Sequence, residues 1–359
     1  MSDSDLKKLR DRIDEIDVDI VELLNERAGQ AQEVGRIKKA QGKEFYVPSR
    51  EREVIEKILE SNKGPFPNQA LKIIYREIMS ASLSLEEPLK VGYLGPSATF
   101  THSACLLYFG SSAKFISQKN ISDVFDEVEK GRVDFGVIPV ENSNEGMVTH
   151  TLDRFTEFNS KICGEIFLPV SHCLINQSGK IEDIKKIYSH PQPIAQCRKW
   201  LAGNAPSIPV LDVASTALAA EMAVEDPSIA AIASKNAANV YDLRVVEARI
   251  EDNLNNVTRF LVIGNVESKR SGFDKTSILL SVKDEPGILY KMLEPFSRYG
   301  VNLTKIESRP LKKKAWEYIF FLDMDGHIEE EEVDKSLSEL KSKCRQLKVL
   351  GSYPKMRMP

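Results

Sequence analysis

The sequence predicts a multidomain chain that is all-α at its N-terminal end, α/β in the middle and α+β at its C-terminal end. Three observations support this prediction. Apolar residues recur at helical spacing over residues 5–85, short apolar runs alternate with helical segments from residue 90, and the order after residue 274 is strand, helix, strand, strand, helix, strand. A length of 359 residues suits two or three domains. The predicted domains are 1–88, 89–270 and 274–355.

The N-terminal segment contains three predicted helices, over about 5–40, 49–60 and 68–85. A glycine at 42 and a Gly/Pro-containing stretch at 62–67 separate them. An all-helical domain with one very long helix is unusual for a monomer. The apolar stripe of the first helix consists of Leu6, Leu9, Ile13, Ile16, Ile20, Leu23, Val34 and Ile37.

The middle segment has the pattern of an α/β domain with a largely parallel sheet. Two groups of strands and helices predict two lobes with a cleft between them. Predicted strands lie at 91–94, 134–138, 186–188, 210–213 and 229–233. After a polar linker at 269–275, the βαββαβ order predicts a ferredoxin-like domain. Its predicted strands are 276–283, 301–307, 316–323 and 347–353, and its predicted helices are 287–299 and 330–343.

Composition excludes several classes of protein. A net charge of -4 argues against a nucleic-acid partner, and the absence of an apolar run of about 20 residues argues against a membrane partner. The polar start at Met1-Ser2-Asp3 predicts no secretory signal. Five scattered cysteines without a Cys-x-x-Cys motif predict a cytoplasmic protein with no metal site. No cofactor is expected, because the sequence carries no nicotinamide-binding fingerprint.

Polar residues interrupt the apolar stripe of the first helix. Arg27 and Gln30 occupy positions where the stripe calls for Leu or Ile. Long side chains can simply extend away from an apolar seam, or Arg27 can bind an anionic ligand inside a helical bundle. At a rise of ~1.5 Å per residue, Lys38 lies roughly 16 Å and Arg10 roughly 25 Å from Arg27 along the helix. If all three cations serve one ligand, Arg10 must come from a second chain.

Residues 5–87 resemble the all-helical chorismate mutase family. The shared motifs are Leu9-Arg10-x-x-Ile13-Asp14-x-Ile16-Asp17, Leu23-Leu24-Asn25-Glu26-Arg27-Ala28, Val34-Gly35-x-x-Lys38 and Tyr46-x-Pro48-x-Arg50-Glu51. The resemblance implies a domain-swapped helical dimer with two composite sites. It also implies that Arg10 of the partner chain, with Arg27 and Arg50, grips the substrate carboxylates.

The same resemblance implies roles for four further residues. Lys38 would hydrogen-bond the breaking ether oxygen, and Glu51 would bind the ring hydroxyl. Ser82 and Glu86 on the third helix would complete the pocket. Rearrangement of chorismate to prephenate needs no covalent step from the protein, so positioning and charge stabilisation can supply the catalysis.

Polar motifs also flank several strands of the middle segment, and the last of them precedes its strand. They are Gly95-Pro96-Ser97-Ala98-Thr99-Phe100-Thr101, Glu141-Asn142-Ser143-Asn144-Glu145, Ser189-His190-Pro191-Gln192, Ser215-Thr216-Ala217 and Asn255-Asn256-Val257-Thr258-Arg259-Phe260. Over residues 90–268 these motifs resemble prephenate dehydratase. The resemblance implies a two-lobed fold similar to periplasmic binding proteins, with the active site in the cleft and Thr258 as the essential threonine.

Substrate-binding candidates in this segment are Thr99, Thr101, Glu141, Asn142, Ser143 and Arg259. Arg259 is either functional or structural, and His190 is either a general acid or a packing residue. Thr258 is expected to hydrogen-bond the leaving hydroxyl, because its own acidity is weak.

Residues 274–355 resemble the ACT domain that is attached to prephenate dehydratases. The motifs are Asp284-Glu285-Pro286-Gly287-Ile288-Leu289 and Glu307-Ser308-Arg309-Pro310. The resemblance implies that Gly287, Ile288, Leu289, Glu307, Ser308 and Arg309 bind phenylalanine, and a module that only dimerises is the alternative.

The whole sequence therefore predicts a bifunctional enzyme of phenylalanine biosynthesis. It would rearrange chorismate to prephenate, an isomerase step, and convert prephenate to phenylpyruvate, a lyase step, with feedback inhibition by L-phenylalanine. Alternatives are a dehydratase that prefers arogenate and a non-catalytic ligand-binding regulator. The expected assembly is a homodimer or a higher even oligomer.

Overall fold

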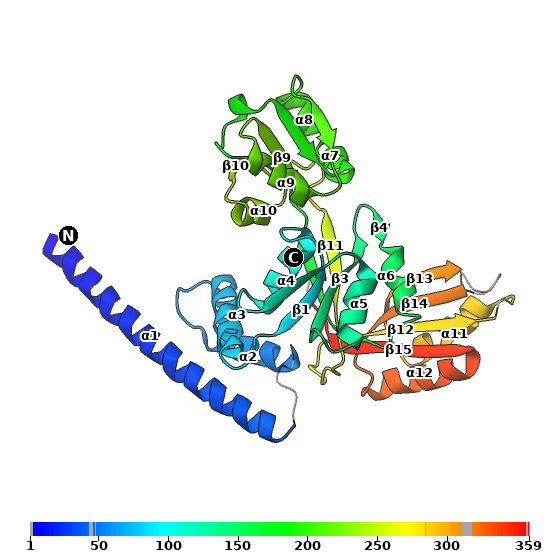
Figure 1. Ribbon diagram of the computed structural model, residues 1–359. Helices are drawn as coiled ribbons and strands as arrows, with labels where there is room; N and C mark the ends of the chain where they lie inside the picture. Colours follow the sequence, from blue (N-terminus) through cyan, green and yellow to red (C-terminus); the bar gives the residue numbers. More distant parts are fainter. Residues whose placement is uncertain are drawn as a thin grey trace. The chain divides into compact units, whose positions relative to one another are not determined.

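The computed structural model describes residues 3–42, 46, 48–283, 285–310, 318–356 and 358 (Figure 1). The chain divides into two compact units. One comprises Met1–Leu89 with Phe109–Lys114, and the other comprises Lys90–Tyr108 with Phe115–Pro359. Asp284, the first residue of the motif at 284–289, and the first two residues of the strand predicted at 316–323 lie outside the described residues.

The first unit consists of the three predicted helices, α1 (Asp3–Ala40), α2 (Pro48–Ser61) and α3 (Asn68–Ser84), so its all-α class is confirmed. Helix α3 contacts both α1 and α2. Much of α1 extends beyond the two shorter helices (Figure 1). Within this chain, Gly35 is the buried residue of α1, and the large apolar side chains of its stripe are 41 to 64% exposed.

The second unit begins with a mixed sheet in the order β2-β1-β3-β11-β5, with β4 beside β3. Strands β1 and β3 are parallel, whereas β11 is antiparallel to both β3 and β5. The strands are β1 (Lys90–Leu94), β2 (Lys114–Gln118), β3 (Phe135–Asn142), β4 (Gly146–Met147), β5 (Lys161–Pro169) and β11 (Val257–Gly264). The helices are α4 (Phe100–Phe109), α5 (Ile121–Glu129) and α6 (Thr149–Arg154).

A second sheet has the order β10-β6-β9-β7-β8. Only the pairs of β7 with β8 and β9 are parallel among its described pairings. Its strands are β6 (Cys173–Asn176), β7 (Lys186–Ser189), β8 (Val210–Asp212), β9 (Ile229–Ala233) and β10 (Arg244–Ala248). Its helices are α7 (Pro191–Gln196), α8 (Arg198–Asn204), α9 (Thr216–Glu225), α10 (Lys235–Val240) and the short 3-10 helix η1 (Ile181–Asp183).

The two sheets confirm the two-lobed α/β class, but the prediction of a largely parallel sheet is wrong. Strands β5, β6, β10 and β11 all make antiparallel pairs. Apolar runs reveal where strands lie, but strand direction depends on how the chain returns to a sheet. Here β5 is the last strand of the first sheet before the chain enters the second sheet, and β11 returns to the first sheet after β10.

The remaining sheet has the order β13-β14-β12-β15 and is antiparallel throughout, which confirms the predicted ferredoxin-like βαββαβ domain. Helices α11 and α12 lie together on one face of this sheet (Figure 1) and cover an apolar core. The elements are β12 (Asp274–Val282), α11 (Ile288–Arg298), β13 (Leu303–Pro310), β14 (Tyr318–Asp325), α12 (Glu331–Lys343) and β15 (Gln346–Pro354).

The opposite face of this C-terminal sheet is buried as well. Leu279, Phe321 and Tyr353 from the sheet belong to the same apolar cluster as Val124 and Phe125 of α5. The C-terminal sheet and the first lobe therefore share one continuous hydrophobic core.

Candidate active sites

One cavity in the first unit gathers most of the residues predicted for the mutase site. It encloses about 330 Å³ between α1, α2 and α3. Six of the seven predicted mutase residues line it, and Arg10 is the exception. The lining residues are Arg27, Gln30, Ala31, Val34, Gly35, Lys38, Tyr46, Arg50, Glu51, Val54, Met79, Ser82, Leu83 and Glu86.

A side chain of α3 holds Arg27 in the cavity wall. The Arg27 Nη1 donates to Ser82 Oγ at 3.0 Å, and Ser82 Oγ donates to the carbonyl of Ile78 at 2.7 Å. Because both partners sit on regular helices, the guanidinium is positioned before any ligand arrives. Ser82 therefore contacts the cation of α1 as well as the cavity.

Glu51 lies on α2 beside a tyrosine that the sequence reasoning did not select. The Tyr46 hydroxyl donates to Glu51 Oε2 at 2.7 Å, and Arg76 Nε lies 4.0 Å from Glu51 Oε1. Burial raises the pKa of Glu51, while Tyr46 and Arg76 oppose the rise. In the sequence, Tyr46 stands out only as the first residue of the motif Tyr46-x-Pro48-x-Arg50-Glu51.

Glu86 packs against the backbone of α1. A β-carbon built on Gly35 would lie 1.4 Å from Glu86 Oε2, so a side chain at residue 35 would force this carboxyl group to move. Desolvation raises the pKa of Glu86, and the nearby cations Lys38, Arg36 and Lys39 act against the rise. The role of Gly35 was missed, because its spacing in the sequence did not show what lies opposite.

The charges in this cavity favour a small anionic ligand. Arg27, Lys38 and Arg50 supply three cations, against the two carboxyl groups of Glu51 and Glu86. Guanidinium groups bind carboxylates through paired hydrogen bonds. In the described conformation Arg50 Nη1 bonds Glu53 Oε2 at 2.8 Å on the surface.

In the second unit, Asn142 and Thr258 meet across the β3–β11 pair. The Asn142 Nδ2 donates to Thr258 Oγ1 and to Asn256 Oδ1, both at 2.8 Å. The Asn142 Oδ1 accepts from the backbone amides of Asn144 at 3.0 Å and Glu145 at 3.1 Å. Because Thr258 accepts in its bond with Asn142, its hydroxyl proton remains available to a ligand.

This polar chain continues to a histidine that the sequence reasoning did not select. Asn256 Nδ2 donates to Gln196 Oε1 at 3.2 Å, and His172 Nε2 lies 2.8 Å from the same oxygen. Burial lowers the pKa of His172, which favours the neutral ring. No hydrogen-bond partner of His172 Nδ1 is found among the described residues. His172 lies between β5 and β6, and neither strand was predicted, so no sequence signal marked it.

Other predicted dehydratase residues serve the local backbone. Thr99 Oγ1 donates to the Pro96 carbonyl at 2.9 Å, and Thr101 is buried. Ser143 Oγ accepts from the Val257 amide at 3.0 Å. The His190 Nδ1 accepts from the Gln192 amide at 3.3 Å at the start of α7, which is the contact expected of a structural histidine.

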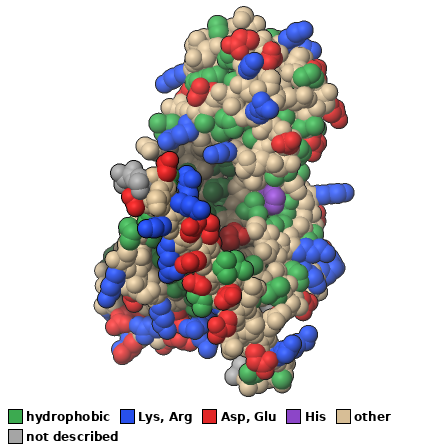
Figure 2. Space-filling model, turned by 90° about the vertical axis from the view of Figure 1, so that its left-hand side faces the viewer, with side chains coloured by type: hydrophobic (Ala, Val, Ile, Leu, Met, Phe, Trp, Pro, Cys, Tyr) green, Lys and Arg blue, Asp and Glu red, His purple; other side chains and the backbone are tan. Residues whose placement is uncertain are grey.

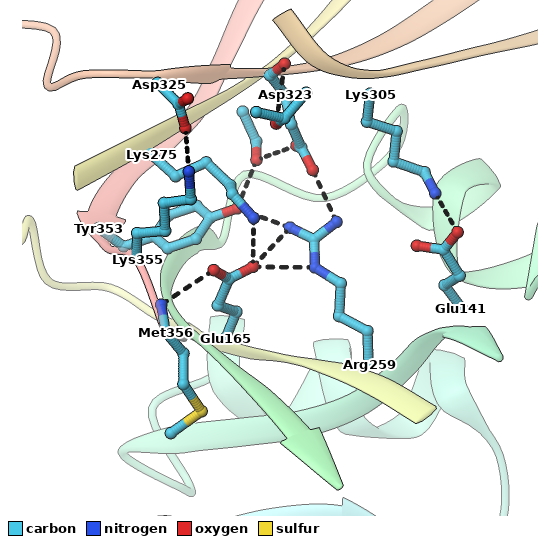
Figure 3. Close-up of polar contacts among 12 residues, drawn as sticks. Glu141, Glu165, Arg259, Lys275, Lys305, Asp323, Asp325, Tyr353, Lys355 and Met356 are labelled. Atoms are coloured by element: carbon cyan, nitrogen blue, oxygen red, sulfur yellow. Dashed lines mark hydrogen bonds and ion pairs between the residues drawn. The ribbon is translucent and has the colours of Figure 1, made fainter. Parts of the chain in front are cut away.

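Glu141 and Arg259 lie apart from the Asn142–Thr258 pair. Glu141 Oε1 pairs with Lys305 Nζ of β13 at 2.6 Å, and Arg259 Nη1 pairs with Asp323 Oδ2 of β14 at 2.6 Å (Figure 3). Arg259 is 4% exposed. The predicted dehydratase set therefore divides into residues beside Thr258 and residues that face the C-terminal sheet.

The predicted effector residues also divide between two faces of the C-terminal sheet. Gly287 adopts a φ of +80° directly before α11, which begins at Ile288, and Leu289 is exposed. Ser308 is in register with Phe320, whose side chain belongs to the core beneath the helices. Side chains alternate along a strand, so Glu307 and Arg309 point to the opposite face. There Arg309 Nη2 lies 3.5 Å from Asp153 Oδ1 of α6.

Figure 2 shows one face of the molecule, where acidic and basic side chains are interspersed. Over the described ranges, none of the helices combines the length and apolar character needed to span a bilayer. Within the same described ranges, no three or more His, Cys, Asp or Glu side chains lie together in a way that could hold a metal ion.

Family comparisons match three successive segments. Residues 9–87 match chorismate mutase type II, residues 91–268 match prephenate dehydratase, and residues 276–342 match the ACT domain. Together these segments cover nearly the whole chain in the order expected from its motifs.

Individual relatives agree with this assignment over full length. The chain is 55% identical to the bifunctional chorismate mutase/prephenate dehydratase of Aquifex aeolicus, covering 98% of each chain. It is 46% identical to the enzyme of the same name from Pseudomonas aeruginosa, covering 99% of each. A prephenate dehydratase from Arthrobacter aurescens, solved in complex with L-Phe, is 34% identical with a TM-score of 0.69, covering 74% of this chain and 90% of that one. The chain belongs to the bifunctional chorismate mutase/prephenate dehydratase family.

Proposed function

We propose that the cavity of the first unit converts chorismate to prephenate and that the Asn142–Thr258 site converts prephenate to phenylpyruvate. The observation that carries the proposal is that Arg27, Lys38 and Arg50 all line one small cavity. Chorismate and prephenate each carry two carboxylates, which these cations can bind.

In the mutase step, one ether C–O bond breaks while one C–C bond forms within a single substrate molecule. Arg27 and Arg50 hold the carboxylates so that the two reacting carbons approach each other. Lys38 and protonated Glu86 donate to the ether oxygen, where negative charge develops. Glu51 binds the ring hydroxyl.

In the dehydratase step, prephenate loses its ring carboxylate as carbon dioxide, and the released electron pair enters the ring as the C–OH bond breaks. The departing hydroxide takes up a proton and leaves as water. Thr258, held by Asn142, donates a hydrogen bond to this leaving oxygen. The developing aromatic ring supplies the driving force, so the site needs no cofactor.

The long helix α1 supports a dimeric assembly. Its apolar stripe is largely exposed within one chain, and such a surface is stable in water only when another surface covers it. Arg10 lies roughly 25 Å from Arg27 along the same helix, so it reaches a cavity only in a second copy of the chain. We assign Arg10 to the partner's site.

L-phenylalanine is the proposed inhibitor, bound by the C-terminal sheet near Gly287 and Ser308. The L-Phe complex of the related dehydratase supports this choice of ligand.

We also place the chain in a reducing compartment, the cytoplasm, because all five cysteines are free and four are buried.

A single assay tests the proposed function. Purified chain is given chorismate, and prephenate and phenylpyruvate are followed over time with and without L-phenylalanine. We expect phenylpyruvate to form and L-phenylalanine to suppress the second step. Parallel reactions with prephenate and arogenate separate the two dehydratase preferences, and a chain that forms neither product contradicts the proposal.

A further inference from the structure

Two adjacent residues on each of two dehydratase strands face opposite ways. In the β3–β11 pair, Thr258 is in register with Asn142 and Arg259 is in register with Glu141. Because side chains alternate along a strand, Thr258 and Asn142 share one face while Arg259 and Glu141 share the other. Any shift of this strand pair therefore moves both couples together.

The C-terminal sheet presents a second couple of complementary charge. Lys305 of β13 is in register with Asp323 of β14. Lys305 Nζ lies 2.6 Å from Glu141 Oε1, and Asp323 Oδ2 lies 2.6 Å from Arg259 Nη1 (Figure 3). We call these two ion pairs the interdomain clamp, because each joins the dehydratase sheet to the C-terminal sheet.

Buried neighbours fix the geometry of the clamp. Arg259 Nε donates to Glu165 Oε2 at 2.9 Å and Arg259 Nη2 donates to the Tyr353 hydroxyl at 3.1 Å. Lys275 Nζ bonds the same Glu165 oxygen at 2.7 Å (Figure 3). Ser277 Oγ donates to Asp323 at 2.5 Å. Burial lowers the pKa of Arg259, but its anionic neighbours outweigh this effect and leave the pKa raised.

Stability alone does not account for such an arrangement. A buried ion pair such as Arg259–Asp323 is often no more stabilising than well-packed apolar residues of similar size. Its directional hydrogen bonds do favour one relative placement of the two partners. Here the fixed placement links Thr258 to the sheet that carries the proposed L-phenylalanine site.

We propose that Glu141 and Arg259 are positioning residues that hold the Asn142–Thr258 pair through the interdomain clamp, and that the clamp transmits inhibition from the C-terminal sheet. Glu141 and Arg259 thus act through other residues and do not bind substrate. This inference rests on the proposed dehydratase function of Thr258. It assigns the ACT domain a part in holding the dehydratase site as well as in binding the effector.

The test removes one charge from each side of the outer, partly exposed ion pair. Glu141→Gln, Lys305→Gln and the double variant are compared with the wild-type chain for dehydratase kcat and KM. Lys335→Gln is the matched control, because it removes a lysine of α12 that pairs with Glu331 on the exposed helix surface. Mutase activity and thermal unfolding establish that each full-length variant is intact.

The clamp predicts that both single variants lower kcat by on the order of tenfold, and that the double variant is no worse than either. KM should change little, and Lys335→Gln should resemble the wild type. If Glu141 binds substrate directly, Glu141→Gln loses activity while Lys305→Gln keeps it, and the positioning role is rejected. If the wild-type chain itself has no dehydratase activity, the proposed function fails and not the clamp.

Inhibition provides the second readout. In Lys305→Gln, the concentration of L-phenylalanine that halves dehydratase activity should rise about fivefold or more. Calorimetry should still detect L-phenylalanine binding to this variant. Unchanged inhibition, or loss of L-phenylalanine binding itself, would overturn the claim that the clamp transmits the signal.

Discussion

The carboxyl group of Glu86 lies directly against the backbone of Gly35, where a side chain on residue 35 would occupy the same space. One end of the mutase cavity is therefore shaped by the absence of a β-carbon. Glu86 is proposed to donate to the ether oxygen, so its placement should control the rate of the mutase step.

Replacing Gly35 by alanine should displace Glu86 and lower mutase kcat by on the order of 100-fold, because a misplacement of about 1 Å is enough for such a loss. Gly29→Ala is the matched control on the same helix, since a β-carbon there meets nothing within 4 Å. The control should keep mutase activity and stabilise α1 by roughly 0.5–1 kcal/mol. Equal mutase rates in the two variants would contradict the role of Gly35.

Mutase activity should decline as pH rises through the pKa of Glu86. The protonated carboxyl group can donate to an ether oxygen, whereas the carboxylate can only accept. Since burial raises this pKa, the donating form persists to higher pH than it does for a free glutamate at about 4.3. Glu86→Gln, which donates at every pH, should flatten the mutase profile. Mutase kcat is measured for both proteins from about pH 5 to 9, with dehydratase activity as the internal control.

Arg10→Ala and Arg27→Ala chains should complement each other if the mutase site is shared between two copies. Each variant alone should be nearly inactive. Mixed in equal amounts under subunit exchange, they should regain about a quarter of the wild-type sites, because half the dimers are mixed and each has one intact site. Mutase activity is followed while mass spectrometry confirms exchange. Exchange without any recovery would rule out the shared site.

Gly351→Ala should separate β15 from β5. A β-carbon at Gly351 would lie 2.1 Å from the backbone oxygen of Ile162, and neither backbone can easily move aside. We expect the second unit to lose about 1–3 kcal/mol of unfolding free energy, as for other overpacked cores. Differential scanning calorimetry measures the loss. Gly203→Ala in α8, where a β-carbon meets nothing within 4 Å, should not lower the unfolding free energy of this unit.

Helical periodicity was sufficient to predict α1, α2 and α3, because apolar residues that recur every three to four positions line one face of a helix and do not fit the alternation of a strand. Strand pairing was not predictable in the same way. The strand β5 (Lys161–Pro169) was missed and the direction of β11 was not foreseen, since both depend on contacts between residues about 100 positions apart. The βαββαβ order of the last domain was predictable because its elements follow one another closely.

The candidate site residues also fell into those that the sequence could predict and those that it could not. Arg27 and Lys38 could be selected because cations on or beside an apolar stripe are conspicuous. Gly35, Tyr46 and His172 could not, because their significance comes from the atoms that lie opposite them. The motif containing Thr258 and Arg259 was visible, but their different orientations became clear only from the strand register.

The core shared by the first lobe and the C-terminal sheet bears on how such enzymes can be rebuilt. Leu279, Phe321 and Tyr353 form a wall of the dehydratase as much as they form part of the ACT domain. A chimera that exchanges the tail at residue 270 for an unrelated regulatory module would expose the apolar core of the first lobe to water on this side. Engineering a new effector response therefore requires redesign of the helix-covered side alone, with the inward face of the sheet kept as it is.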